Sequence, residues 1–448
     1  MNFSEDTETM AEQNYTISDI IETYISGDWG NDEPTEDTSC PVSCIRGADI
    51  VPIYNSEYNN IPLRYISEKS LSNRALQEGD IVIEKSGGSP TQSTGRVVYI
   101  SKELLEEKQD IVCSNFCAAF RIKPEWDAKY VYYYLQHIYN AGVFFNFEGK
   151  TSGLKNLIMD TAFKSITIKK IAIETQRSIA TVLSTIESKM AANRAINHYL
   201  EAMAKQLYDY WFVQFDFPDE NGKPYKSSGG KMVWNDKLKR EIPEGWSAKS
   251  INEITVCVRG VSYDKSDLLN DRTGVLVLRG NNIQDNKLVY DNNVAFIPRT
   301  LISQDQAIKK GDIIMTMSSG SKEHVGKCAY FHKDCFHTYG AFLNKYRAIE
   351  NHSMLLFSFM SSPVFKGTIK NICNGTGINN LTNQNFDSVY MPCPNTAILK
   401  KYNANITPLF EKIGNLDAEI EMLNIKRDEL LPLLMTGQVS VKQLNNDL

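Results

Sequence analysis

Hydrophobic residues recur with heptad spacing in two long segments of the chain. Their steps alternate between four and three residues, which is the pattern of a and d positions in a coiled coil. In the first segment this stripe contains Ile179, Leu183, Ile186, Met190, Leu200 and Leu207, with Asn193 and Asn197 as polar members. In the second it contains Leu409, Ile413, Leu416, Ile420, Leu423 and Leu430, with Arg427 as a polar member. We therefore predict coiled-coil helices over residues 174–212 and 396–440, whose polar members either fix the register or lie at the stripe's edge.

Outside these helices the pattern becomes short and β-rich. Runs such as residues 80–83 and 96–100 alternate with Gly and Ser, which predicts domains built around a sheet. The aromatic and apolar segments 130–135 and 354–360 each fit a helix with one buried face. The predicted parts are an acidic flexible leader (1–15), a mixed domain (16–173), the first helix, a connector (213–241), a second mixed domain (242–395), the second helix and a tail (441–448).

The two mixed domains carry the same landmarks in the same order. Each has an Arg-Gly segment, a Gly-Asp entry into a strand, a Gly followed by a cation, an aromatic residue followed by Arg, and a Gly-containing loop that ends in Asn-Leu. In the first half these lie at residues 45–50, 78–83, 95–96, 120–121 and 152–157. In the second half they lie at residues 278–283, 310–315, 326–327, 346–347 and 376–381. The repeat is too long for a solenoid and indicates a duplicated domain.

Chain order then predicts the arrangement of these parts. The second domain begins after the first helix ends and finishes where the second helix begins, so both of those helix ends lie close to it. The helices should therefore run antiparallel, with the domains at opposite ends of the pair. We expect an α+β protein in which two mixed α/β domains flank an antiparallel two-helix coiled coil with approximate two-fold symmetry.

Composition limits the class of protein. With 448 residues, 42% of them hydrophobic, the chain can bury several cores. It has no apolar run approaching the ~20 residues of a membrane span and no secretory signal pattern, so we expect a cytoplasmic protein. Nine cysteines, an odd number, favour reduced thiols over a disulfide framework.

The net charge of −6 conceals an asymmetry. The first 45 residues hold eleven acidic side chains and no Lys or Arg, whereas the rest of the chain holds 48 basic against 43 acidic residues. The acidic segment is typical of a solvated, flexible leader. Binding to nucleic acid depends on where basic residues cluster, so the overall charge does not exclude it.

The sequence offers little chemistry for catalysis. Asp80, Glu84 and Lys85 have the spacing of a nuclease carboxylate cluster, but the second copy lacks the counterparts of the last two, and a strand with a polar end is the simpler interpretation. Cys40, Cys44, Cys113 and Cys117 could form two halves of a zinc site, although their spacing is loose. We predict no catalytic residue, no bound metal and no cofactor on this chain.

Polar loops that suit DNA occur in both copies. Ser, Gly and Lys follow corresponding strands and can donate to phosphates, while Asn can pair with adenine and Arg or Lys with guanine. The predicted DNA-binding residues are Arg46, Lys85, Ser86, Arg96, Lys155 and Asn156 in the first copy and Arg279, Asn281, Ser319, Lys322, Lys327, Asn379 and Asn380 in the second. Each position alone is weak evidence, and the repetition strengthens it.

The layout resembles the specificity (S) subunit of type I restriction-modification systems, the HsdS family. The resemblance covers about residues 16–442 and depends on modest motifs in a specific order. They are the Ile-Pro-Glu-Gly-Trp segment at 242–246, the Gly-Asp entries at 79–80 and 311–312, the segments at 153–157 and 377–381, and the closing segment at 430–439. The first domain departs from the family in lacking an Ile-Pro-x-Gly-Trp opening.

The resemblance implies a subunit that binds double-stranded DNA, with two recognition domains that each read half of a split, asymmetric site and a coiled coil that measures the unread spacer. It implies two methyltransferase (M) subunits, which use S-adenosylmethionine to methylate adenine, and restriction (R) subunits that use ATP and Mg²⁺. Two other functions stay open. The acidic leader is also compatible with a coiled-coil scaffold that binds other proteins, and a fused enzyme with an unrecognised active site is a weaker alternative.

Overall fold

The computed structural model describes residues 13–87, 92–151, 154–270, 273–284, 286–289, 294–373 and 379–441. Most of the predicted leader and nearly all of the predicted tail lie outside these ranges. The chain divides into two compact units: unit 1 contains residues 1–192 and 419–448, and unit 2 contains residues 193–418. Both long helices contribute residues to both units. No helix among the described residues is both long and apolar enough to cross a bilayer.

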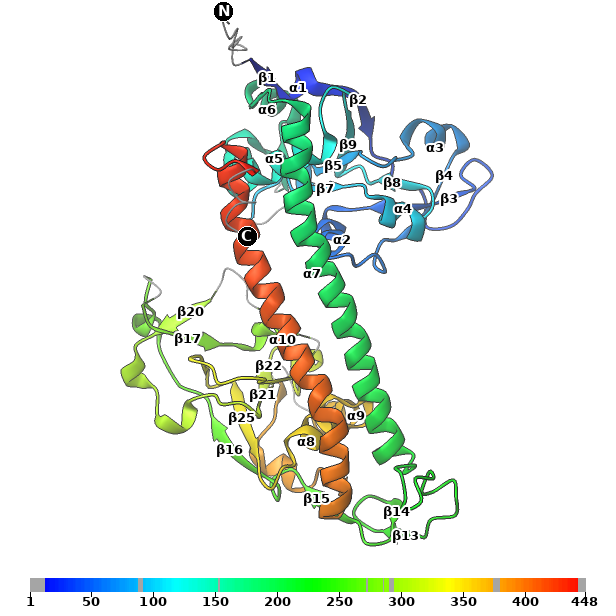
Figure 1. Ribbon diagram of the computed structural model, residues 1–448, viewed down its shortest axis with the longest axis vertical. Helices are drawn as coiled ribbons and strands as arrows, with labels where there is room; N and C mark the ends of the chain where they lie inside the picture. The colour runs from blue at the N-terminus through cyan, green and yellow to red at the C-terminus, as the bar shows by residue number, and fades with distance from the viewer. Residues whose placement is uncertain are drawn as a thin grey trace, which may run out of the picture. The chain divides into compact units, whose positions relative to one another are not determined.

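Unit 1 is built around an antiparallel four-stranded sheet of order β2-β9-β5-β7 (Figure 1). Its strands are β2 (Ile21–Ser26), β9 (Cys117–Ile122), β5 (Ile81–Glu84) and β7 (Val97–Tyr99). Every residue of β5 is buried, because α5 (Ala128–Asn140) packs near β7 and β9 on one face and a second apolar cluster covers the other. The helix predicted from residues 130–135 is therefore confirmed.

A second sheet of unit 1 has the order β4-β3-β8, in which β3 (Cys40–Ile45) pairs in parallel with β8 (Ile111–Cys113) and antiparallel with β4 (Leu63–Ile66). The remaining helices are α1 (Ile17–Ile20), α2 (Ile50–Tyr54), α3 (Glu68–Arg74), α4 (Lys102–Glu107) and α6 (Met159–Ser165). The remaining strands are β1 (Asn14–Thr16), β6 (Ser86–Gly87), β10 (Glu148–Thr151), β11 (Leu154–Leu157) and β12 (Thr167–Lys169). The first strand of the described residues, β1, begins two residues before the predicted domain start.

Unit 2 repeats this topology. Its main sheet has the order β16-β25-β21-β23, formed by β16 (Thr255–Arg259), β25 (Leu343–Ala348), β21 (Asp312–Thr316) and β23 (Cys328–Tyr330). A three-stranded sheet of order β20-β17-β24 corresponds to β4-β3-β8, with the same antiparallel and parallel pairings. Its strands are β20 (Ala295–Ile297), β17 (Val275–Leu278) and β24 (Thr338–Tyr339). The shared strand order confirms that the domain is duplicated.

The other elements of unit 2 include the helix predicted from residues 354–360. The helices are α8 (Ser353–Ser361) and α9 (Pro363–Ile372). The strands are β13 (Met232–Asn235), β14 (Arg240–Pro243), β15 (Ser247–Ser250), β18 (Ile283–Gln284), β19 (Lys287–Leu288), β22 (Ser318–Ser319), β26 (Asn379–Asn380) and β27 (Tyr390–Cys393). Strands β13 and β14 form a hairpin, so regular structure extends into the predicted connector (213–241).

A buried carboxylate begins the central strand region of each sheet. Asp80 is fully buried, and its two oxygens accept from Nε and Nη2 of Arg121 on β9, both at 2.9 Å. In unit 2 Asp312 is equally buried and accepts from the same atoms of Arg347 on β25, both at 2.7 Å. Bidentate pairs of this kind satisfy a carboxylate that would otherwise be costly to bury. The acidic residue at the end of the strand is therefore explained by its role in stabilising the fold rather than by a nuclease site.

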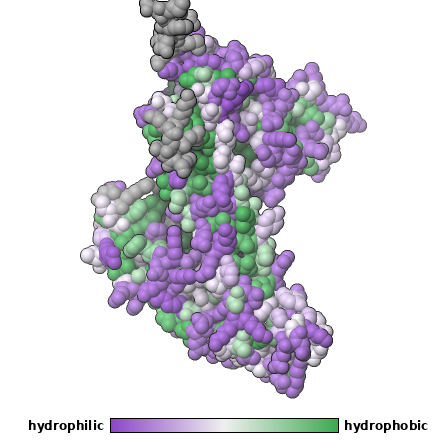
Figure 2. All heavy atoms as spheres, viewed as in Figure 1, coloured by the Kyte–Doolittle hydropathy of each residue, from purple (hydrophilic) through white to green (hydrophobic). Residues whose placement is uncertain are grey.

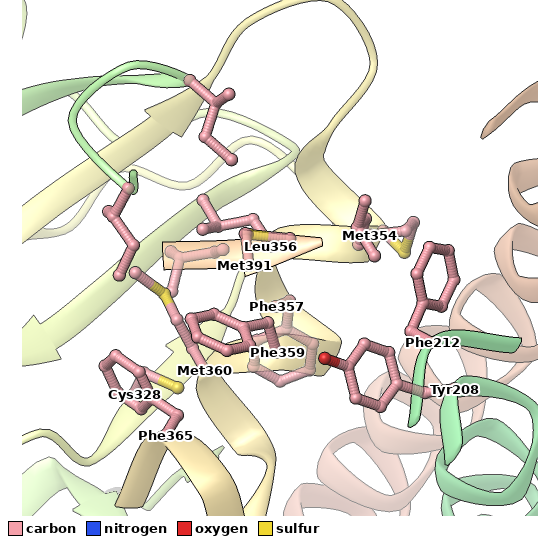
Figure 3. Close-up of a cluster of buried hydrophobic side chains, with 14 of the residues drawn as sticks. Tyr208, Phe212, Cys328, Met354, Leu356, Phe357, Phe359, Met360, Phe365 and Met391 are labelled. Carbon is pink, nitrogen blue, oxygen red and sulfur yellow. The ribbon is translucent and has the colours of Figure 1, made fainter. Parts of the chain in front are cut away.

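The two long helices are α7 (Ile173–Tyr208), which continues as a π-helical turn over Asp209–Val213, and α10 (Thr396–Met435). In unit 1 the beginning of α7 shares an apolar core with the end of α10, where Leu183 and Leu434 belong to one cluster. In unit 2 the end of α7 shares a core with the beginning of α10 and with α8 (Figure 3). Within each unit the helix segments are therefore antiparallel, and α10 ends before Gly437, which has φ +72°.

The predicted heptad positions differ in their burial. Fully buried members are Ile179, Leu183, Met190, Ile413 and Leu416, together with Asn193 and Asn197. Partly buried members are Ile186, Leu200, Leu207, Leu409, Ile420, Leu423 and Leu430. Near the end of α10 the buried side chain is Leu431 rather than Leu430. Two causes explain these differences. A straight helix does not keep a seven-residue repeat on a single face, and a second face of each helix also packs apolar residues into the domain cores.

One polar contact joins the two helices inside unit 2. Asn197 Nδ2 donates to Asp417 Oδ1 at 2.6 Å, while Asn197 Oδ1 is buried with no hydrogen-bond partner among the described residues. Desolvation raises the pKa of the Asp417 carboxyl, with the nearby Lys287 and the Asn197 hydrogen bond opposing that rise. Because Asp417 itself is exposed, the pair fixes a polar register at only a small cost in stability.

Asp417→Asn should stabilise the protein slightly at neutral pH, because an amide at this exposed position removes a partly desolvated charge and can donate to Asn197 Oδ1. A raised folded-state pKa means that the ionised carboxylate opposes folding above it, and that this penalty disappears below the unfolded-state pKa. Thermal unfolding should therefore give a midpoint about 1–2 °C higher than wild type at pH 7, shrinking toward zero at strongly acidic pH. A variant that is less stable at pH 7 would contradict this interpretation.

Candidate nucleic-acid interface

Three loops of unit 1 meet at the end of β5 that lies away from Asp80. The backbone N–H groups of Lys85 and Ser86 donate to the carbonyl of Phe116 at 2.8 and 3.0 Å. The carbonyl of Lys85 accepts from the N–H of Leu157 at 2.7 Å, and the Ser86 hydroxyl bonds Asn156 Oδ1. We call this arrangement of residues 85–87, 114–117 and 154–157 the three-loop cluster.

Unit 2 contains the same cluster in residues 317–319, 340–343 and 379–381. The N–H of Met317 donates to the carbonyl of Phe342 at 2.9 Å, and the carbonyl of Met317 accepts from the N–H of Leu381 at 2.7 Å. The Ser318 hydroxyl bonds Asn380 Oδ1, as Ser86 bonds Asn156. Loops that share few residue types therefore keep the same hydrogen bonds, which indicates that the cluster is a defined feature of both units.

Several predicted DNA-binding residues lie in these clusters. In unit 1 they are Lys85, Ser86, Lys155 and Asn156. In unit 2 they are Ser319, Asn379 and Asn380, with β22 and β26 pairing Ser319 to Asn379. The side chains of Asn379 and Lys322 lie outside the described parts of the structure, as do residues 88–91, 152–153 and 374–378 of the adjoining loops.

Two of the predicted lysines are available to a ligand. Lys85 lines an open pocket of about 410 Å³ together with Tyr24, Ile158 and Asp160. Lys327 lies at the start of the segment that leads into β23 and is half-buried. Neither side chain forms an ion pair within the ranges that the structure describes, so both ammonium groups can meet a phosphate.

Three other predicted cations are already paired inside unit 1. Arg96 binds the buried Glu84 through Nη2 at 2.7 Å and Nε at 2.9 Å. Lys155 lies 3.3 Å from Glu148, and Arg46 lies 2.8 Å from the buried Asp49. Hydrogen bonding to Asp49 and Glu84 raises the pKa of Arg46 and of Arg96, respectively. These side chains hold the loops in place, and a sequence pattern cannot distinguish that role from a phosphate contact.

The residues of unit 2 that correspond to these ion pairs of unit 1 carry less charge. Arg279 precedes a 3-10 turn as Arg46 does, but its Nε donates to the Tyr263 hydroxyl at 3.0 Å. Asn281 in that turn is exposed. Thr316 occupies the place of Glu84, since its N–H bonds the Lys327 carbonyl as that of Glu84 bonds the Arg96 carbonyl. The two units therefore share a frame and differ in the polar groups placed on it.

The cysteines considered as zinc ligands behave as core residues. Cys44, Cys113 and Cys117 are buried, and burial raises the pKa of the Cys44 and Cys117 thiols to about 12. Within the described ranges no group of His, Cys, Asp or Glu side chains has the arrangement of a metal site, and none of the nine cysteines forms a disulfide.

The structure also adds a residue pair that the sequence analysis missed. Phe116 and Phe342 occupy the same place in the two clusters and are both exposed. The sequence does contain a signal for this pair, because in each copy a phenylalanine stands five residues before the arginine of the buried Asp–Arg pair. An isolated Phe in a β-rich segment is ordinarily assigned to the core, which is why the repetition was overlooked.

Matched substitutions at Arg96 and Lys327 should have different effects on stability. Arg96→Met leaves Glu84 buried and unpaired, which should cost about 3–5 kcal/mol. Lys327→Met removes a cation that forms no ion pair within the described ranges and should cost less than about 1 kcal/mol. Urea unfolding of the full chain measures both. Equal losses would show that Arg96 and Glu84 do not stabilise unit 1 as a buried pair.

Comparison with known proteins agrees with this duplicated architecture. The model of the type I restriction modification DNA specificity domain matches residues 13–202 and 243–423. The chain is 31% identical over 191 residues to the type I restriction enzyme EcoKI specificity subunit of Escherichia coli (strain K12), a match that spans 41% of this chain and 40% of that relative. It is 25% identical over 423 residues to the MjaIX specificity subunit of Methanocaldococcus jannaschii, which covers 89% of this chain and 88% of that relative.

Among solved structures, the S subunit of a type I restriction-modification system from M. genitalium has a similar fold. Its TM-score is 0.55 at 15% sequence identity, with 96% of this chain and 98% of that chain covered. This likeness concerns the fold alone. The family match extends over most of the chain and includes both units. The chain therefore belongs to the family of type I restriction-modification DNA specificity subunits.

Proposed function

We propose that this chain reads a split, asymmetric site on double-stranded DNA, with one half-site read by each unit. The observation that carries the proposal is the duplicated three-loop cluster, in which a serine–asparagine pair lies beside exposed or half-buried polar groups in both units. The names of the relatives support the same function. The heptad helices would set the length of the unread spacer.

The chemistry of the cluster fits base and phosphate contacts. Asn380 is exposed, and its Oδ1 has a second lone pair after it accepts from Ser318, so the amide can still pair with adenine. Lys85 and Lys327 would bind phosphates and release counterions. The serine in each unit would hold the asparagine amide in one orientation before DNA arrives, which lowers the entropy cost of binding.

We also infer that the chain works without catalytic groups of its own. Modification subunits carrying S-adenosylmethionine would methylate adenine, and restriction subunits using ATP and Mg²⁺ would cleave DNA. The carboxylates that most resembled a nuclease site, Asp80 and Glu84, are engaged with Arg121 and Arg96, which supports this division of labour.

Helix α7 carries a candidate surface for the modification subunits. Ile196, Tyr199 and Met203 form a stripe at helical spacing and are 43%, 68% and 53% exposed. Figure 2 shows hydrophobic surface along the part of α7 that belongs to unit 2. Apolar side chains grouped in this way on a helix are typical of protein interaction sites. The stripe is our candidate docking site for a modification subunit.

DNA reading is tested by selecting bound duplexes from a randomised pool with the full chain and measuring affinity for the selected duplex at several salt concentrations. Lys85→Ala and Lys327→Ala should each weaken binding and lower the slope of log K against log salt by about one. Lys102→Ala, which removes an exposed lysine from α4, is the matched control and should leave both unchanged. A wild-type chain that selects no sequence would overturn the proposal and favour the scaffold alternative.

Docking is tested by co-purification with the modification subunit of the same system. Tyr199→Glu combined with Met203→Glu should reduce the recovered complex at least tenfold, because charges would be buried in an apolar contact. Val364→Asp changes an exposed apolar residue of α9 and serves as the control. Normal recovery with the α7 variant would place the docking surface elsewhere.

A further inference from the structure

Both units expose a phenylalanine at the same point of the three-loop cluster. Phe116 is 57% exposed and Phe342 is 68% exposed. Their carbonyls accept from the strand that carries Lys85 in unit 1 and Met317 in unit 2. Exposure of one aromatic ring is ordinary, but the same exposed ring at equivalent positions of two diverged copies calls for a shared cause.

Each ring is presented by a tight turn. In unit 1 the N–H of Cys117 bonds the Ser114 carbonyl at 2.9 Å, and in unit 2 the N–H of Leu343 bonds the Gly340 carbonyl at 2.8 Å. The phenylalanine is the third residue of both turns. The backbone beneath the ring is thus fixed at both ends by β-structure.

A glycine from the neighbouring strand region packs against each turn. A Cβ added at Gly27 would collide with the Ser114 carbonyl, and one added at Gly260 would collide with the Gly340 carbonyl. Both units therefore use the same close backbone approach to hold the turn. The ring is held above a rigid support, and binding would order little more than its own two torsions.

The surroundings indicate which ligand the rings serve. Strand β6 pairs with β11 and strand β22 pairs with β26 directly beside the two turns, which places the Ser86–Asn156 and Ser318–Asn380 pairs next to the phenylalanines. In unit 1 the ammonium group of Lys85 belongs to the same cluster. An aromatic face combined with amide groups and a cation is the chemistry that binds nucleobases and their phosphates.

We propose that Phe116 and Phe342 contact the bases of the two half-sites through their ring faces, each ring stacking at a base step of the half-site read by its own unit. This inference rests on the proposed DNA-reading function and adds the residues that provide the apolar part of recognition. Aromatic and other apolar side chains placed at a base step respond to how easily that step unstacks, so they contribute to specificity without hydrogen bonds.

The test compares ring-removing and ring-retaining variants of the full chain on the duplex selected by the wild-type protein. Phe116→Leu and Phe342→Leu keep an apolar side chain but lose the ring, and each should bind about tenfold to a hundredfold more weakly. The salt slope should stay unchanged, because no phosphate contact is lost. Phe116→Trp and Phe342→Trp should remain within about threefold of wild type.

Phe336→Leu is the matched control. This phenylalanine of unit 2 is 89% exposed and lies outside the three-loop cluster, so its replacement should leave DNA affinity unchanged. A repeated selection adds a second readout: Phe116→Leu should relax one half-site only, and Phe342→Leu the other.

The outcomes separate this inference from the function on which it rests. If the wild-type chain selects a sequence but both leucine variants bind it normally, stacking by these rings is refuted while DNA reading stands. Loss of affinity accompanied by a smaller salt slope would also refute stacking, since it would indicate a disturbed phosphate contact. If the wild-type chain selects no sequence, the proposed function fails first.

Discussion

Each unit depends on a fully buried carboxylate that binds an arginine on the neighbouring strand, and in unit 2 the Nζ of the buried Lys345 also lies 3.8 Å from Asp312. Asp80 and Asp312 stand at the same place, directly after glycines with φ +92° and +91°. Each accepts two hydrogen bonds from an arginine on the neighbouring strand. Each also accepts a hydrogen bond from the backbone N–H of the residue three positions earlier, at 2.8 Å in both units. Breaking such a pair leaves an uncompensated buried charge, at a cost of about 3–5 kcal/mol.

This pair also controls where the candidate interface lies. Arg121 and Arg347 are on β9 and β25, and the same strands begin at the turns that carry Phe116 and Phe342. In unit 2 Asp312 pairs with Arg347 at one end of the ladder, and Thr316 pairs with Leu343 at the other. A slip of one residue would turn every side chain of the strand to the opposite face. The bidentate ion pair between Asp and Arg therefore fixes the strand register that brings the three loops together.

On this shared frame the two units place different polar groups. Unit 1 adds the buried pairs Glu84–Arg96 and Asp49–Arg46, whereas unit 2 has Thr316 and Asn282 at the corresponding positions. These ion pairs occupy the guanidinium groups of Arg46 and Arg96 in unit 1. Duplication followed by this kind of change gives two surfaces of one architecture with distinct chemistry, as reading an asymmetric site would require.

The duplication and both long helices could be predicted because they leave periodic or repeated signals in the sequence. The Gly-Asp and aromatic-Arg landmarks proved to be the two halves of the buried pair. The sequence could not predict which side chains form ion pairs with one another. Arg96 and Lys155 have the character of phosphate ligands in the sequence, but the fold places Glu84 and Glu148 beside them. The β13–β14 hairpin was missed because its strands are short and lie among turn-forming residues. The change from Leu430 to Leu431 arises from packing against unit 1, which heptad spacing does not encode.

The central claim is that both units read DNA. It is tested most directly by expressing this chain with its modification subunit and mapping methylated adenines in the host DNA by single-molecule sequencing. The account predicts one asymmetric motif made of two short defined halves separated by a spacer of constant length. A motif with only one defined half would contradict reading by both units, and a complex that assembles but leaves the DNA unmethylated would contradict the DNA-reading function itself.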